Sequence, residues 1–175
     1  MSAKPTLIGV ISDTHGLLDE KVLELFRGVR SIIHAGDIGR EDLIWQLEGI
    51  APVVAVRGNN DPDTMCFPNE RMALIEGRTF YVRHIFTTVE KMTGAQQRII
   101  ERHMPDAVIY GHSHKAYSGT WRGTLLFNPG SAGPKRFSLP RTVGLLEITE
   151  ESITPRIISL ESLGSLESLE SQKKD

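Results

Sequence analysis

The first sixty residues alternate between short runs rich in Ile and Val and longer amphipathic segments, and this alternation limits the fold more than any other feature. The runs that resemble strands are 7–12, 31–36 and 52–58. The intervening segments, 17–28 and 40–49, repeat apolar residues at the spacing of a helix that packs on one side. A strand–helix–strand series with short connections predicts parallel strands covered by helices, which is an α/β fold.

The second half of the chain shows a different pattern, in which several strands follow one another. Residues 71–84 predict a hairpin with a two-residue turn at Glu76 and Gly77. Residues 90–103 predict a helix ahead of a buried strand at 106–111. Three further strands are expected at 123–131, 142–149 and 153–160. Their apolar faces need a partner, and two sheets packed face to face with helices outside would supply one.

The bulk properties favour one globular domain. Of the 175 residues we assign 1–158 to the domain and 159–175, where Leu recurs every three residues, to a low-complexity tail. Cys66 is the only cysteine, which excludes an intrachain disulfide and a thiolate zinc site, and we expect it to be a buried or half-buried apolar residue.

Charge and hydropathy limit the partners and the location. A net charge of −2 offers no basic surface for stable nucleic-acid binding. No run approaches the about 20 apolar residues of a membrane span, and the N-terminus lacks the pattern of a signal peptide, so the cytoplasm is the expected location and no membrane partner is expected. The oligomeric state stays open, with a homo-oligomer as one alternative.

Metal-binding residue types follow four of the predicted strands. The stretches are DTHG at 13–16, GDIG at 36–39, GNND at 58–61 and GHSH at 111–114. Asp13 and His15 are one residue apart, so in an extended segment they project to the same side, and His112 and His114 repeat this spacing. Because ligands of open α/β sheets bind at the carboxyl ends of the strands, these side chains are expected to meet there.

The donor set predicts a pair of metal ions. Asp37, Asn59 and His84, which closes the predicted hairpin, bring the set to two carboxylates, four imidazoles and one amide. This mixture is too large for one ion, and it favours Mn, Fe, Co, Ni or Zn over Ca or Mg. We expect two divalent ions, manganese first among them. Their four positive charges outweigh the two carboxylates, so the site would attract an anionic phosphoester.

In this order and spacing, the four stretches resemble the signature blocks of the calcineurin-like metallophosphoesterases, and the chain is similar to their small bacterial and archaeal phosphodiesterases. The resemblance covers residues 7 to about 149, including NPGSAG at 128–133. It implies a four-layer α-β-β-α sandwich of two mixed sheets. It also implies a phosphodiesterase in which a metal-bridging hydroxide attacks the phosphorus of a small phosphoester in line.

The resemblance implies a role for each site residue. Asp13, His15 and His114 would hold one metal ion. Asn59, His84 and His112 would hold the other, and Asp37 would bridge the two. Asp61 would orient the loop behind them. The residues assigned to catalysis are Asp37, Asn59, His112 and Asp61.

Two positions depart from the family pattern. Asn60 stands where members with a strong general acid carry His, and an amide cannot donate a proton at neutral pH. Protonation of a poor leaving group would therefore depend on another source, such as water. His84 is followed by the bulky Ile85 where the family has Gly, which makes His84 the least secure of the predicted ligands.

Other residues have alternative interpretations. His34 is expected to be a packed strand histidine and His103 a solvated one, whereas Lys135 and Arg136 are expected to be surface charges, with a contact to substrate phosphate as their alternative. The whole chain has an alternative function as a non-catalytic metal-binding scaffold for protein–protein interaction. The discriminating feature is the ligand set, because every predicted ligand position holds a suitable residue. A nuclease is disfavoured, since no basic patch is present.

Overall fold

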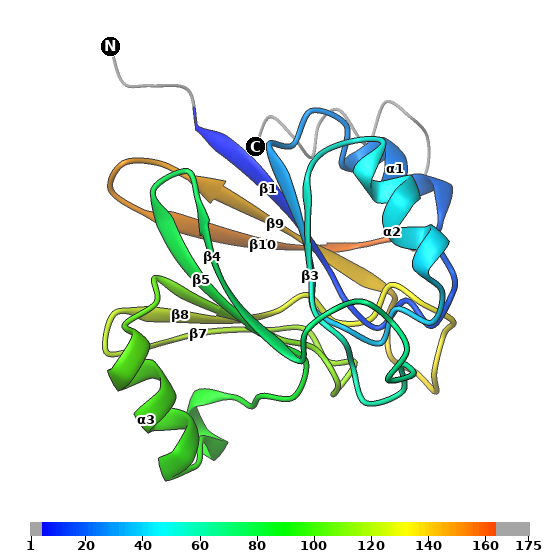
Figure 1. Ribbon diagram of the computed structural model, residues 1–175. Helices are drawn as coiled ribbons and strands as arrows, with labels where there is room; N and C mark the ends of the chain where they lie inside the picture. The colour runs from blue at the N-terminus through cyan, green and yellow to red at the C-terminus, as the bar shows by residue number, and fades with distance from the viewer. Residues whose placement is uncertain (1–4, 164–175) are drawn as a thin grey trace.

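The computed structural model describes residues 5–163 and contains two five-stranded sheets (Figure 1). The first sheet has the strand order β10-β9-β1-β2-β3. Its strands are β1 (Thr6–Ile11), β2 (Ser31–His34), β3 (Val53–Ala55), β9 (Thr142–Ile148) and β10 (Ile153–Ser159). Strands β1, β2 and β3 are parallel, whereas β9 runs antiparallel to both β1 and β10, so the sheet is mixed.

The second sheet has the order β4-β5-β6-β8-β7 and is mixed as well. Its strands are β4 (Glu70–Ile75), β5 (Arg78–Arg83), β6 (Ala107–Ile109), β7 (Tyr117–Trp121) and β8 (Thr124–Asn128). Strands β5, β6 and β8 are parallel, and the edge strands β4 and β7 are antiparallel to their neighbours.

Helices cover the outer faces of both sheets, which gives four layers. Helices α1 (Glu20–Leu25) and α2 (Glu41–Glu48) pack on the first sheet, and the 3-10 helix η1 (Val89–Lys91) and α3 (Gly94–His103) on the second. Apolar side chains fill the space between the sheets, among them Val10, Ile33, Val82, Ile109 and Phe127. The predicted α-β-β-α sandwich of two mixed sheets is confirmed.

Capping explains where the structure departs from the predicted helix bounds. Helix α1 is shorter than predicted because Asp19 caps it, accepting a hydrogen bond of 3.0 Å from the backbone N–H of Lys21. Helix α3 begins at Gly94 instead of residue 90 because Thr93 and Gln96 form a capping box. The hairpin turn at Glu76 and Gly77 is confirmed, and both residues have a positive φ, as a tight turn of this hand requires.

One expectation about a single residue was wrong, and one strand was not predicted. Cys66 is exposed, and the buried residue of this loop is its neighbour Met65. Strand β7 was not predicted, because three of the five residues of YSGTW are polar or Gly and every residue in it is at least partly exposed. At the C-terminal end, Leu160 and Leu163 are buried in the core under α1 and α2, so packing extends beyond residue 158; the remainder of the predicted tail lies outside the described residues.

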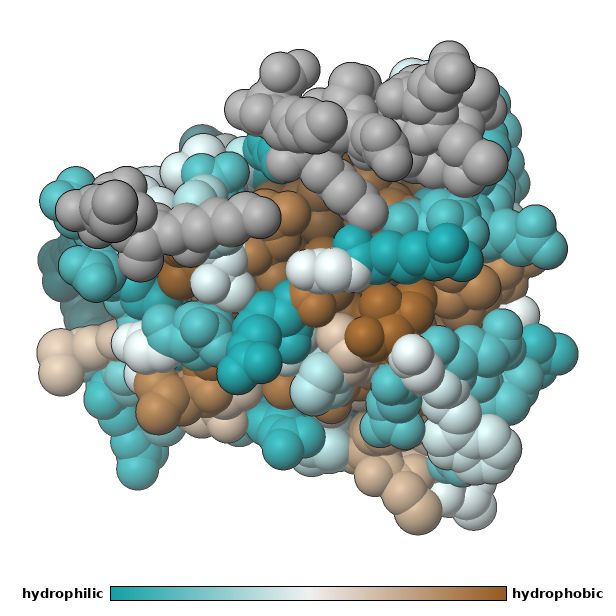
Figure 2. Space-filling model, turned by 90° about the horizontal axis from the view of Figure 1, so that it is seen from above, coloured by the Kyte–Doolittle hydropathy of each residue, from teal (hydrophilic) through white to brown (hydrophobic). Residues whose placement is uncertain are grey.

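No helix within residues 5–163 is long and apolar enough to cross a bilayer. In the view from above, hydrophobic residues occupy the middle of the face and hydrophilic residues border them (Figure 2).

Candidate metal centre

The loops that follow five strands converge at one edge of the sandwich. These strands are β1, β2 and β3 of the first sheet and β5 and β6 of the second. The first sheet supplies Asp13 after β1, His15 in the same loop, Asp37 after β2 and Asn59 after β3. The second sheet supplies His84 after β5, and His112 and His114 after β6. All seven side chains predicted to bind metal therefore lie at this edge, and the two sheets both contribute.

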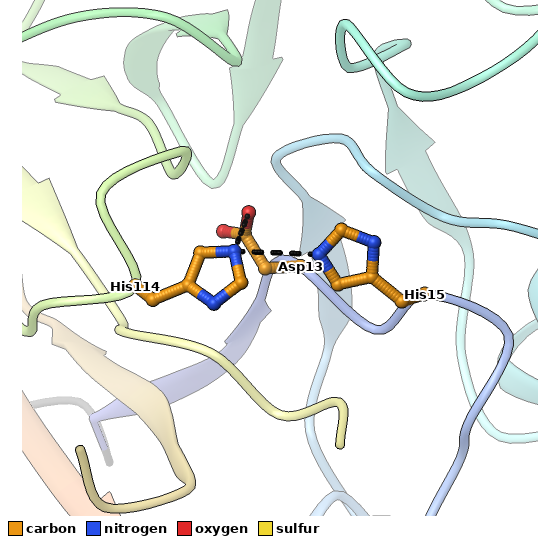
Figure 3. Close-up of side chains that lie close together, drawn as sticks. All are labelled: Asp13, His15 and His114. Carbon is orange, nitrogen blue, oxygen red and sulfur yellow. Dashed lines mark hydrogen bonds and ion pairs between the residues drawn. The ribbon is translucent and has the colours of Figure 1, made fainter. Parts of the chain in front are cut away.

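Asp13, His15 and His114 form the first cluster (Figure 3). The Nε2 atom of His114 lies 3.1 Å from Oδ1 of Asp13 and 3.3 Å from Nε2 of His15. The two imidazoles come from different sheets and turn the same ring nitrogen toward each other. Three donor atoms that point at a common position suit the binding of one cation.

Asp13, Asp37 and His84 form the second cluster. The Nε2 atom of His84 lies 3.3 Å from Oδ2 of Asp37 and 3.9 Å from Oδ1 of Asp13. On its other side, Oδ2 of Asp37 is 3.8 Å from Nε2 of His15. Asp37 therefore stands between the imidazoles of His15 and His84, which is the position a bridging carboxylate needs. Asp13 contributes to both clusters.

A backbone carbonyl fixes the orientation of His84. Its Nδ1 lies 2.7 Å from the carbonyl oxygen of Ala35, so Nδ1–H donates and Nε2 is left with its lone pair toward the carboxylates. Metal-binding histidines commonly have their second nitrogen held in this way. Ile85 is exposed, so the bulky residue after His84 does not displace the ring.

Asn59 and His112 lie on the exposed side of the second cluster. Oδ1 of Asn59 is 2.9 Å from Nδ1 of His112, and the ring of His112 packs edge-on against that of His84 at 5.4 Å between centroids. The backbone N–H of His112 donates to Oδ2 of Asp13 at 3.1 Å. These contacts join the last two predicted ligands to the other five.

Buried polar atoms without hydrogen bonds show that the clusters suit a cation. Among the described residues, Oδ1 of Asp13 and Nε2 of His84 are buried and have no hydrogen-bond partner. A buried acceptor left without a partner destabilises the fold by about 1–3 kcal/mol. Carboxylate and imidazole lone pairs that face one another in this way suit a divalent transition metal ion, which would bind both.

Asp37 is ionised at neutral pH although it is buried. Burial acts to raise the pKa of its carboxyl, but the nearby imidazole of His84 and hydrogen bonds from Asn60 outweigh burial and hold the pKa well below its usual range. Asn60 donates twice, from its backbone N–H at 2.9 Å and from its side-chain amide at 2.6 Å. Asn60, which departs from the family pattern, therefore positions the carboxylate predicted to bridge the metals. For His15, burial lowers the imidazole pKa, Asp37 raises it, and the pKa is lowered on balance.

The backbone at the site adopts a conformation that ordinary residues avoid. Asp13, His15, Asp37, His112 and His114 all have φ between 46° and 68°. The left-handed region costs an L-residue about 1–2 kcal/mol, and such strain clusters at functional sites. Sequence reasoning did not predict this feature, although Asp and His are among the residues that tolerate it.

Asp61 holds the loops that carry Asp37 and Asn59. Its two carboxylate oxygens accept hydrogen bonds from the backbone N–H groups of Ile38 at 3.0 Å, Gly39 at 2.8 Å and Gly58 at 2.8 Å. Asp61 therefore contacts backbone and no predicted ligand atom, and its role in orienting the loop stays a prediction. Gly58 has to be glycine, because a Cβ there would collide with the carboxylate of Asp37.

His34 has a role at the site that the sequence did not indicate. It is fully buried in β2, as predicted, and burial lowers the pKa of its imidazole to about 4, so it is neutral. Its Nδ1 accepts from the N–H of Gly36 at 3.2 Å, so Nε2–H donates to Oγ1 of Thr14 at 2.9 Å. Thr14 in turn donates to the carbonyl of Ile38 at 3.0 Å, which joins the loops after β1 and β2.

Comparison with known proteins agrees with the fold. Residues 7–151 match the model of the calcineurin-like phosphoesterase superfamily domain. A probable metallophosphoesterase of Methanothermobacter thermautotrophicus is 36% identical over 159 residues, which cover 87% of this chain and 91% of the relative. The solved structure of an archaeal phosphodiesterase superposes with a TM-score of 0.74 at 26% identity, covering 89% of this chain and all of the other. Vacuolar protein sorting 29 of Cryptosporidium parvum shares the fold, with a TM-score of 0.71, 17% identity, and 90% and 99% coverage.

The fold, the clustered donors and these matches define a metal-dependent hydrolase of phosphoric esters. The chain belongs to the calcineurin-like phosphoesterase superfamily. Within it, the chain groups with the small archaeal and bacterial metallophosphoesterases and phosphodiesterases that consist of little beyond the core domain.

Proposed function

We propose that this protein hydrolyses phosphodiesters at a centre of two divalent metal ions, with manganese as the first candidate and Ni, Fe, Co or Zn as alternatives. The observation that carries the proposal is the convergence of seven donor side chains from both sheets. Two of them are buried carboxylates, and Oδ1 of Asp13 has no hydrogen-bond partner among the described residues. Imidazole and carboxylate donors together suit these ions better than Mg or Ca. A pair of such ions would convert a shared water to hydroxide near neutral pH and polarise the phosphoryl group for in-line attack.

Each of the predicted site residues would have a defined role in this reaction. Asp13, His15 and His114 would hold one ion, Asn59, His84 and His112 the other, and the ionised Asp37 would bridge them. His112 lies on the exposed side of the centre, where its imidazole would also face a bound phosphoryl oxygen and stabilise the charge that develops there. Asp61 would keep the loops of Asp37 and Asn59 in place through its three backbone contacts.

The test uses the purified protein with and without added Mn²⁺ or Ni²⁺. Metal content is measured first, and then cleavage of bis-p-nitrophenyl phosphate and of p-nitrophenyl phosphate. We expect about two ions per chain, metal-stimulated turnover of the diester and a lower rate with the monoester. Asp37→Ala should abolish turnover, because the carboxylate between His15 and His84 is lost. Asp63→Ala is the matched control, since Asp63 is exposed and pairs only with Arg57 among the described residues.

Two results would remove the proposal. The metal-replete protein could hydrolyse neither ester, or the Asp37→Ala variant could keep the activity of the wild type. A ratio of one ion per chain with full activity would contradict the dinuclear centre alone and leave the hydrolase class intact.

A scaffold for protein–protein contacts is the second candidate function, favoured by the fold shared with vacuolar protein sorting 29. The likeness is at the level of the fold. Every position predicted to bind metal in this chain carries a suitable donor, and this supports the hydrolase over the scaffold. We further propose a small phosphoester as the substrate partner, a cytoplasmic location, and no stable binding of nucleic acid or membrane; a homo-oligomer is one alternative for the oligomeric state.

A further inference from the structure

Arg136 lies at the exposed border of the metal centre. Its Nη2 is 3.4 Å from Nε2 of His15, the ring nitrogen that also faces His114 and Asp37. Arg136 is exposed, and no carboxylate within residues 5–163 forms an ion pair with it. Its neighbour Lys135 differs, because Lys135 pairs with Glu161 at 3.1 Å.

An anion between Arg136 and the centre would be favourable when the centre holds a cation. A cation bound to Nε2 of His15 would use the lone pair toward which the Arg136 guanidinium now points. The guanidinium, which forms no ion pair with a carboxylate of the described residues, would then face a positive charge at close range, and Coulomb repulsion would oppose this arrangement. A phosphoryl oxygen between the two would remove the repulsion, since a guanidinium binds phosphate through parallel N–H donors.

The segment that carries Arg136 is anchored at both ends. At its start, the N–H of Gly133 donates to the carbonyl of Asp13 at 3.1 Å, next to the ligand itself. At its end, Arg141 donates to the carbonyls of Ala132 and Gly133 at 2.9 and 2.8 Å and pairs with Asp19 at 2.9 Å. The two ends of the segment that carries Arg136 are therefore fixed next to the centre.

Phe137 is the second unusual residue of this segment. Its side chain is 95% exposed, and its φ of 53° lies in the left-handed region. This conformation costs an L-residue about 1–2 kcal/mol, and the exposed ring gains nothing from burial in return. An aromatic ring directly after a phosphate-binding arginine suits an ester whose organic group is itself flat, because aromatic faces stack on nucleobases and aryl rings.

We propose that Arg136 and Phe137 form the substrate-recognition segment of this centre. Arg136 binds a non-bridging phosphoryl oxygen, and Phe137 packs on the flat ring of an aryl or nucleoside phosphodiester. This inference rests on the proposed function for the identity of the reaction, but the phosphate contact itself can be measured without turnover.

The test of Arg136 uses Arg136→Ala and Arg136→Lys, with Lys135→Ala as the matched control. Inorganic phosphate is titrated into the manganese-loaded protein by calorimetry, and the metal content of each variant is measured. Arg136→Ala should weaken phosphate binding about tenfold or more and raise KM for bis-p-nitrophenyl phosphate by a similar factor, as loss of a charged hydrogen bond predicts. Arg136→Lys should restore part of the binding, and Lys135→Ala should stay within about twofold of the wild type.

Unchanged phosphate binding in Arg136→Ala, with metal content intact, would overturn the role of Arg136. If the wild type hydrolysed no ester but bound phosphate through Arg136, the proposed function would fail while the phosphate contact stood. Normal hydrolysis with no effect of Arg136→Ala would refute the contact and leave the proposed function standing, so the two failures are distinguishable.

The test of Phe137 compares two diesters that share the p-nitrophenyl leaving group. One is the p-nitrophenyl ester of thymidine 5′-phosphate, and the other is methyl p-nitrophenyl phosphate. The wild type should prefer the nucleoside ester, and Phe137→Ala should reduce this preference in kcat/KM by about fivefold or more, the lower end of base stacking on an aromatic side chain. An unchanged preference would overturn the role of Phe137. The role would also be overturned if Phe137→Ala changed the protein from a dimer to a monomer, because the ring would then belong to a contact between two copies.

Discussion

The two edges of the sandwich use similar residues in opposite ways. At the metal edge, the carboxylates of Asp13 and Asp37 approach imidazoles, and Oδ1 of Asp13 is buried with no hydrogen-bond partner in the described part of the chain. At the other edge, Asp106 stands just before β6. Its carboxylate accepts from the N–H and hydroxyl of Thr79 at 2.7 and 2.8 Å and from Arg78 at 3.2 Å.

The backbone shows the same contrast. Both edges contain residues with positive φ. At the far edge, Glu76, Gly77, Arg122 and Gly123 lie in hairpin turns and Met104 ends α3, so turns and a helix C-cap explain them. At the metal edge, five of the residues with positive φ are Asp or His residues outside any such hairpin turn. A carboxylate whose hydrogen bonds are all formed, at an edge where turns explain the backbone, therefore stabilises the fold. A carboxylate that has an unpaired oxygen and a strained backbone is available to bind a ligand.

The largest effect is expected for Asp13→Asn at the metal edge. The substitution keeps the size of the side chain but removes the negative charge shared by both clusters. We expect metal binding to weaken and kcat/KM for bis-p-nitrophenyl phosphate to fall by about 10³-fold or more, because charge stabilisation by bound metal ions contributes several kcal/mol. The melting temperature of the metal-free protein should change by less than about 4 °C, the equivalent of about 1 kcal/mol for a chain of this size.

Asp106→Ala should have the reverse outcome. Three donors lose their acceptor, so we expect the free energy of unfolding to fall by about 1–3 kcal/mol, whereas kcat/KM per folded molecule stays at the wild-type value. Urea unfolding and initial rates on the same preparation measure both quantities. Asp63→Ala serves as control, with a change within about 0.5 kcal/mol. A large loss of activity in Asp106→Ala would contradict the division between the two edges.

Asn60→His probes how the metal edge handles the leaving group. An imidazole next to Asn59 could donate a proton that the amide of Asn60 cannot. We expect the ratio of kcat/KM for an alkyl diester to that for bis-p-nitrophenyl phosphate to rise about tenfold, less than a fully positioned acid provides. Asn60→Gln is the matched control, because it keeps an amide in place of the acid. Equal effects of the two variants would show that the change disturbs Asp37 instead of supplying a proton.

The smallest effect concerns stability at low pH. Burial acts to raise the pKa of Asp106, but the bonds from Thr79 and Arg78 outweigh it, and the pKa lies below the value of 3.8 expected for an unfolded chain. A lowered pKa in the folded state stabilises the protein above pH 3.8, and this contribution is lost as the pH falls further. The wild type should therefore lose stability below about pH 4 more steeply than Asp106→Asn, by less than about 1 kcal/mol because the pair is partly exposed.

Much of the architecture could be predicted from local patterns. Runs of Ile and Val placed β1, β2 and β3, and Glu76–Gly77 placed the hairpin, because burial and turn geometry depend on residues close in sequence. Strand β7 was missed because its pairing with β8, and not its own composition, makes it a strand. Cys66 was misplaced because the burial of a loop residue depends on which neighbour turns inward, and here Met65 does.

The site was predictable in its residue types but not in its supporting contacts. Asp-x-His and His-x-His spacing and the position of Asp37 after a strand indicated where donors would meet. The carbonyl of Ala35 that orients His84 and the link from His34 to Thr14 join segments far apart in sequence, so no local pattern could indicate them. The contact of Arg136 with the ring of His15 is likewise a product of the folded arrangement.

The division of the donors between the two sheets has a consequence for the lifetime of the protein. Four of them belong to the first sheet and three to the second, so a bound ion connects layers whose interior contact is otherwise apolar packing. A metal ion that binds only the folded protein shifts the folding equilibrium away from the unfolded chain. Resistance to proteases should therefore follow the supply of transition metal, and starvation for that metal would remove the protein as well as its activity.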